Sequence, residues 1–190
     1  MIFILFEDKN KGKLNVAVVY VDWADSPGTD EDYKFYQEQT KILKDFYWMV
    51  SENFLELNLV FSNKWFRING SYKDFITLSE DEAQTGSAPK KQKFYDAAVA
   101  ASDPQTNYAG IDMVIFAIPK GKKVFAEGLH EFNWLYNGYL KTAEGNIFDI
   151  VAAGDSYLIP THLPPWVLYA HEMGHMIGTP HQADETSKGR

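Results

Sequence analysis

The sequence contains no cysteine among its 190 residues. Disulfide bonds and thiolate metal sites are therefore excluded. Any transition metal must be bound by His, Asp or Glu side chains. The lack of cysteine is compatible with both a cytosolic protein and a secreted bacterial one, so it does not decide the compartment.

Long apolar runs are also lacking. The N-terminal run Met1–Phe6 has six residues and no basic residue before it. A secretory signal needs a longer apolar region and a small-residue cleavage site. No stretch reaches the roughly 18 apolar residues of a membrane-spanning helix. We therefore expect no membrane partner, and either a cytosolic protein or a mature or partial form of a secreted one.

Basic residues are outnumbered, with 18 Lys and Arg against 26 Asp and Glu and a net charge of −8. This balance argues against nucleic acid as a partner. The spare carboxylates raise the alternative of a Ca²⁺ site. No EF-hand spacing is present, and a solvated loop is the favoured interpretation. The acidic residues concerned are Asp22, Asp25, Asp30, Glu31, Asp32, Asp184 and Glu185.

Hydrophobic residues make up 45% of the chain and aromatic residues 15%, enough for a sizeable core. We expect one domain covering residues 1–190, and a monomer, because no repeat or linker divides the sequence. The stretch 132–140 ("FNWLYNGYL") is rich in aromatic residues. It could form a sugar-binding platform, but core or cleft wall is the favoured interpretation.

Apolar periodicity predicts the elements of the first half. A buried strand is expected over Lys13–Trp23, followed by a helix over Glu31–Phe54 that Asp30 caps. The apolar face of that helix is predicted at Tyr33, Tyr36, Leu43, Tyr47, Val50 and Phe54. Alternation predicts a second strand over Leu55–Ile68.

The second half is predicted to begin with a surface connection over Asn69–Lys91. Next comes a helix that starts at Lys90 and stops before Pro104. It is followed by a buried strand over Ile111–Pro119 and by irregular strands near Phe132–Leu140 and Asn146–Ala153. The last helix covers Thr161–Gly178. This order indicates an α/β layer with a mixed, twisted sheet. The glycine-rich connections after the third strand are too short for helical crossovers, so we expect at least one later strand to be antiparallel.

Three of the five histidines lie in the stretch "YAHEMGHMIGTPHQ". His171 and His175 are four residues apart, so on a helix they share one face and can bind one metal ion. Gly178 lets the chain turn, which can return His181 as a third nitrogen ligand. Trp166, Ala170, Met173 and Ile177 are predicted to form the opposite, buried face.

Glu172 is displaced around the helix from the two histidines and suits a general base better than a ligand. With three protein ligands, Zn²⁺ keeps an open position and makes a bound water acidic near neutral pH. Glu172 can take the water's proton and pass it to the leaving amine. The pattern therefore predicts peptide-bond hydrolysis with one catalytic Zn²⁺ and no covalent intermediate.

The full pattern H-E-x-x-H-x-x-G-x-x-H resembles the zinc signature of the metzincin metalloproteases. His171, Glu172, His175, Gly178 and His181 all match it. The words "HEMGHMIGTPH" also resemble immune-inhibitor-A-like (M6-type) peptidases. The resemblance implies a metzincin-like N-terminal subdomain. That subdomain has a twisted five-stranded mixed sheet with an antiparallel edge strand, a long backing helix, a second helix and an active-site helix. It also implies a secreted protease acting on proteins or peptides.

The sequence departs from the metzincin pattern after His181. Metzincins carry a methionine turn downstream of the third histidine, whereas all five methionines here precede His181. We therefore expect a chain that lacks most of the C-terminal subdomain, either as part of a longer protein or as a short variant.

Other interpretations stay open. One is a non-catalytic, zinc-stabilised binding domain, and another is a metal-dependent amidase of small substrates. His130 and His162 are lone histidines and are interpreted as structural. An edge strand within Val124–Leu140 is a hypothesis for binding extended substrate by strand addition.

Overall fold

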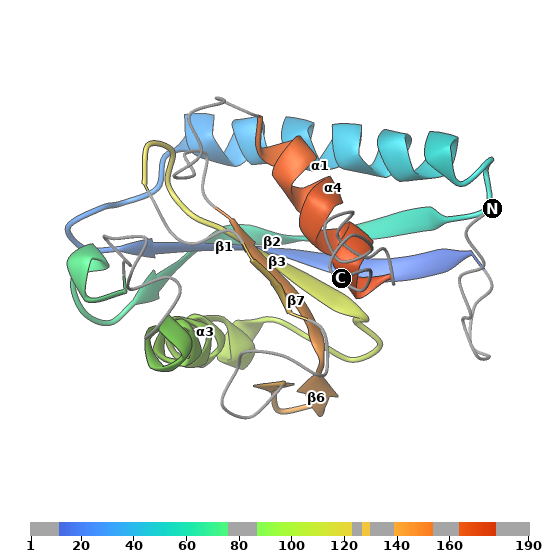
Figure 1. Ribbon diagram of the computed structural model, residues 1–190. Helices are drawn as coiled ribbons and strands as arrows, with labels where there is room; N and C mark the ends of the chain where they lie inside the picture. Colours follow the sequence, from blue (N-terminus) through green and yellow to red (C-terminus); the bar gives the residue numbers. More distant parts are fainter. Residues whose placement is uncertain (1–11, 76–86, 123–126, 130–138, 154–163, 178–190) are drawn as a thin grey trace, which may run out of the picture.

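A computed structural model describes residues 12–75, 87–122, 127–129, 139–153 and 164–177. The described residues form a mixed α/β structure around one five-stranded sheet. Helices α1 (Asp30–Val50) and α4 (Pro165–Met176) lie on one face of this sheet, and α3 (Ser87–Ser102) lies on the other (Figure 1). The α/β class predicted from the sequence is confirmed.

The sheet has the strand order β2-β1-β3-β7-β4. The first four strands are mutually parallel, and β4 pairs antiparallel with β7 at the edge. The expectation of a mixed sheet with a late antiparallel strand is therefore confirmed. The strands are β1 (Lys13–Trp23), β2 (Glu56–Ile68), β3 (Met113–Ala117), β7 (Asp149–Ala153) and β4 (Glu127–Leu129).

The central strands contribute to two cores, one on each face. Along β1, Val18 and Tyr20 belong to the cluster that includes α1 and α4 residues. Val19 and Val21 alternate with them and belong to the cluster on the α3 face. Because both faces are covered, β1 and β3 carry continuous apolar runs, which is why these two strands were correctly predicted.

Helix α1 begins one residue earlier than predicted, and its cap is different. Thr29 is the N-cap, and Thr29 and Asp32 form a reciprocal capping box. The prediction that Asp30 caps the helix was wrong. Thr29 suits the cap better because a glutamate or aspartate three residues later can bond back to its amide.

The predicted C-terminal end of α1 was also too late. The helix ends at Val50, and Glu52 and Asn53 adopt positive φ angles of 55° and 65° that stop it. Val50 and Phe54 were placed on the buried face by their spacing. They are instead 52% and 54% exposed, because they lie at and beyond the last turn.

Helix α3 begins at Ser87, three residues before its predicted start. A 3-10 turn occupies Tyr72–Phe75 within the predicted surface connection, and Phe75 is buried against the α3 side of the sheet. A second 3-10 turn, Asp103–Gln105, follows α3 where Pro104 was predicted to end it.

The later strands differ in part from prediction. The region 146–153 divides into β6 (Asn146–Ile147) and β7, with the exposed Phe148 between them. Strand β6 pairs with β5 (Leu140–Lys141) in a separate two-stranded sheet. Apart from its last two residues, the strand expected over 132–140 lies outside the described residues.

Within the described ranges, no helix combines the length and apolar character needed to cross a membrane.

Candidate metal centre

Helix α4 begins at Pro165, whose fixed φ and missing amide hydrogen suit the first helical position. Tyr169 and Met173 are fully buried, and Met176 is nearly so. The spacing of apolar residues predicted Met173 on this buried face, but Tyr169 and Met176 were not predicted there. The other predicted members of this face are partly buried against the same cluster: Trp166, Ala170 and Ile177.

His171 lies on the exposed side of α4, away from the buried face. Position 175 follows four residues later in the same helix, so positions 171 and 175 share one helical face. The side chain of His175, Gly178 and His181 lie outside the described residues. The structure thus brings two of the three predicted ligand positions together and does not describe the third.

Glu172 is half-buried and follows His171 directly. One residue along a helix turns about 100° around the axis, so Glu172 lies beside the histidine face and not on it. This placement suits a base that acts on a metal-bound water better than a third protein ligand of the metal. Within the described ranges no group of three or more His, Asp or Glu residues could hold a metal ion.

Helix α1 contacts α4 through two hydrogen bonds and a pair of aromatic rings, in addition to the core that they share. The Tyr47 hydroxyl donates to the Ala170 carbonyl at 2.8 Å. The rings of Phe46 and Trp166 lie 5.7 Å apart between centroids. The Trp166 amide, which has no partner within the helix, donates to Gln39 Oε1 at 3.4 Å. Burial raises the pKa of Tyr47 above its ordinary value, so its hydroxyl stays a donor at neutral pH.

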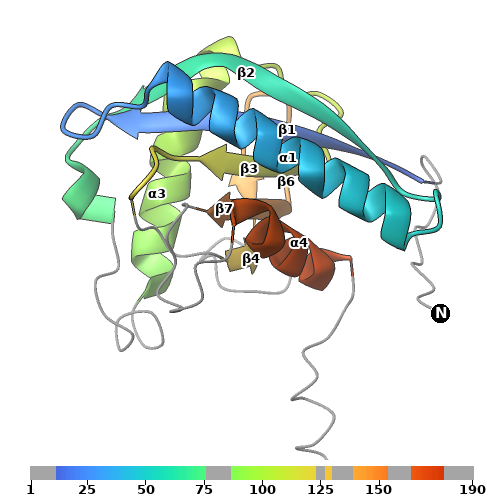
Figure 2. The ribbon, with the colours of Figure 1, turned by 90° about the horizontal axis from the view of Figure 1, so that it is seen from above.

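Strand β4 lies at one edge of the described sheet, next to this helix. Within the part of the chain that the structure describes, β4 pairs with β7 alone. Helix α4 contacts both β4 and β7, and Figure 2 shows α4 lying over this side of the sheet. The helix that carries the histidines therefore lies beside an edge strand within the predicted range 124–140.

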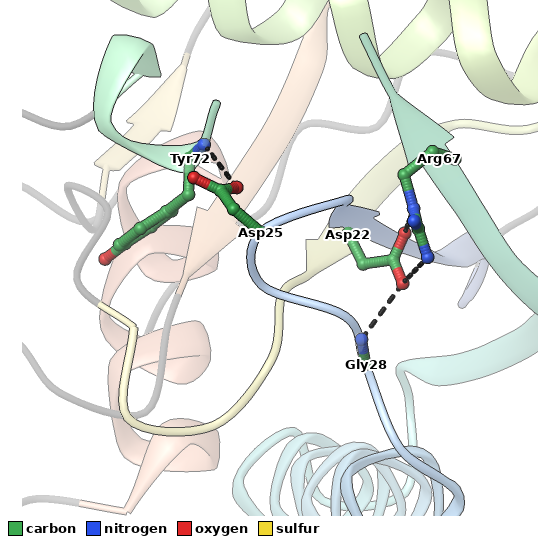
Figure 3. Close-up of polar contacts among 5 residues, drawn as sticks. All are labelled: Asp22, Asp25, Gly28, Arg67 and Tyr72. Carbon is green, nitrogen blue, oxygen red and sulfur yellow. Dashed lines mark hydrogen bonds and ion pairs between the residues drawn. The ribbon is translucent and has the colours of Figure 1, made fainter. Parts of the chain in front are cut away.

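The acidic residues at the carboxyl end of β1 have structural partners (Figure 3). Asp22 is only 2% exposed and is the register neighbour of Arg67 on β2. It accepts from Arg67 Nε at 2.6 Å and Nη2 at 3.0 Å, and from the Gly28 amide at 2.9 Å. The bidentate pair joins the ends of β1 and β2, and the bond from Gly28 holds the loop between β1 and α1 to the same carboxylate.

The carboxylates of Asp25 and Asp32 also accept hydrogen bonds, in their case from hydroxyl groups and backbone amides. Asp25 accepts from Ser71 Oγ at 2.6 Å and from the Tyr72 amide at 3.0 Å, which lowers the pKa of its carboxyl. Asp32 accepts from Thr29 in the capping box and is 8% exposed. The interpretation of these residues as a solvated loop was therefore wrong for Asp22 and Asp32. Calcium at these carboxylates would have to displace protein donors.

Several predicted features lie outside the described residues: His130, His162, Asp184, Glu185 and nearly all of the aromatic stretch 132–140.

The contact of Tyr47 with α4 was missed by sequence reasoning. Its helical spacing marked it as a core residue, and nothing in the spacing identifies the partner of a buried hydroxyl.

No protein-family model matches the chain, and a search of curated proteins found no match either.

Proposed function

We propose that this chain is the catalytic domain of a zinc-dependent endopeptidase of the metzincin type. His171, His175 and His181 are its zinc ligands, and Glu172 is its general base. The observation that carries the proposal is the way α4 packs on the sheet. One face of the helix is buried, while His171 and the position of His175 share another face, and the helix contacts the edge strand β4 of the described sheet.

The donor set suits zinc. Imidazole nitrogens are preferred zinc ligands, and the helical spacing of His171 and His175 matches the usual pair. Zinc, when bound, supplies Lewis acidity for the water and the scissile carbonyl. Glu172 accepts the proton of the attacking water and donates it to the leaving amine, so the chain needs no nucleophilic side chain.

Strand β4 supplies the substrate site in this proposal. An edge strand presents backbone groups that an extended peptide can pair with, and such pairing does not require a particular sequence. An edge strand beside α4 favours a peptide over a small amide, which a closed pocket would suit better. Protein or peptide substrates are therefore preferred to the amidase alternative.

The first experiment combines zinc binding with peptide cleavage. We expect the zinc-loaded protein to bind one Zn²⁺ per chain and to cleave a library of unstructured peptides, and both properties to be lost in His171→Ala. Chelation should abolish cleavage, and added Zn²⁺ should restore it. Zinc bound one to one without any cleavage would support the non-catalytic, zinc-stabilised domain. Unchanged zinc binding by His171→Ala would overturn the proposed ligand set.

Proline substitutions in β4 test the substrate site. Amides alternate between the two sides of a strand, so one of Glu127 and Gly128 points its N–H away from β7. Proline at that position removes one hydrogen bond to substrate, and we expect cleavage to fall up to about tenfold with zinc binding unchanged. Steady-state cleavage of one library peptide measures the effect.

The matched controls are Glu127→Ala and Gly128→Ala, which retain the amide. Both are expected to cleave at close to the parental rate. If both proline variants are folded and cleave as fast as their alanine counterparts, substrate does not pair with β4.

A further inference from the structure

Tyr47 reaches from α1 to the backbone of the helix that carries the histidines. Its side chain is only 4% exposed, and its hydroxyl bonds the carbonyl of Ala170, the residue directly before His171. In an α-helix this carbonyl also accepts from the amide of residue 174. The tyrosine therefore bonds α4 within the turn that connects His171 to His175.

The other hydrogen bond and the ring contact described above between α1 and α4 act at a different place. Gln39 and Phe46 both contact Trp166, in the first turn of α4. Further along α4, the apolar side chains of Tyr169 and Met173 pack into the core shared with α1 and the sheet. The bond to Ala170 adds a directional contact to this packing, one turn after Trp166 and next to the ligand positions.

We propose that Tyr47 is a positioning residue for the metal centre. Together with the buried face of α4, its hydroxyl fixes the rotation of the helix backbone and thereby the placement of positions 171 and 175. This inference rests on the proposed zinc site. Metal affinity depends on ligand direction, and groups that orient ligands commonly change affinity by about 10–100-fold when removed. Because Tyr47 acts through backbone, we expect a smaller effect, about three- to tenfold.

The test is Tyr47→Phe, which removes the hydroxyl and keeps the ring. Its matched control is Tyr33→Phe. Tyr33 is also on α1, and its hydroxyl donates to a backbone carbonyl, that of Ser62 on β2, at 2.7 Å. Both variants lose one bond of the same kind between α1 and another element. Only Tyr47→Phe loses a bond to α4.

Three measurements separate positioning from general stability. They are the dissociation constant for Zn²⁺ by competition with a chelating dye, the absorption spectrum of the Co²⁺-substituted protein, and amide hydrogen exchange along α4 without metal. We expect Tyr47→Phe to bind Zn²⁺ about three- to tenfold more weakly, to alter the Co²⁺ spectrum and to exchange faster in α4. Tyr33→Phe should match the parent in all three.

Equal zinc affinity and equal Co²⁺ spectra for Tyr47→Phe and the parent would overturn the positioning role while leaving the zinc site intact. Equal weakening by Tyr47→Phe and Tyr33→Phe would overturn it too, because the effect would then be one of stability. A parent protein that binds no Zn²⁺ would overturn the proposed function, and this inference with it.

Discussion

The Glu172→Gln variant is expected to bind one Zn²⁺ with parental affinity and to cleave peptides about 10²–10⁴-fold more slowly. Glutamine has the shape of glutamate but cannot accept the water's proton. Glu172 lies beside the histidine face of α4, so its change to an amide should leave the ligands in place. The turnover number at saturating zinc, measured on one peptide, tests this.

Glu38→Gln is the matched control, because Glu38 is an exposed acid on α1 and its neutralisation removes the same charge. We expect parental cleavage from it. If Glu172→Gln cleaves as fast as Glu38→Gln, another group accepts the proton. If Glu172→Gln loses its zinc, Glu172 contributes to metal binding and the assignment of roles must change.

The parts of the fold that the sequence predicted well are those determined by local patterns. The buried strands β1 and β3 are continuous apolar runs, and β1 has the bounds that were predicted. The placement of His171 and His175 on one helical face follows from their spacing alone. Such features need no knowledge of which elements meet.

The features that were missed depend on long-range contacts. A late antiparallel strand was expected, but the place of β7 between β3 and β4 was not predicted, because no local pattern encodes the order of strands in a sheet. Asp22 was assigned to a solvated loop because its partner, Arg67, is 45 residues away. The Tyr47 bond to Ala170 spans 123 residues.

Met173→Ala is expected to lower the free energy of unfolding by about 2–5 kcal/mol. Met173 is fully buried and belongs to the cluster between α1, α4 and the sheet. Removing most of its side chain leaves a cavity under the turn that joins His171 to His175. Urea denaturation of the metal-free protein measures the loss of stability, and zinc titration of the folded variant measures the effect on the site.

Two other methionines separate the contributions of burial and position. Met49 on α1 is 68% exposed, so Met49→Ala should change stability by less than about 0.5 kcal/mol. Met113 on β3 is 2% exposed in the same cluster, so Met113→Ala should cost about as much as Met173→Ala. Of these three methionines, Met173 alone lies on α4, so among the three variants only Met173→Ala should also weaken zinc binding by the folded protein. If Met173→Ala leaves the free energy of unfolding nearly unchanged, α4 does not pack on the sheet through this face. The metal-binding helix would then not be anchored as proposed.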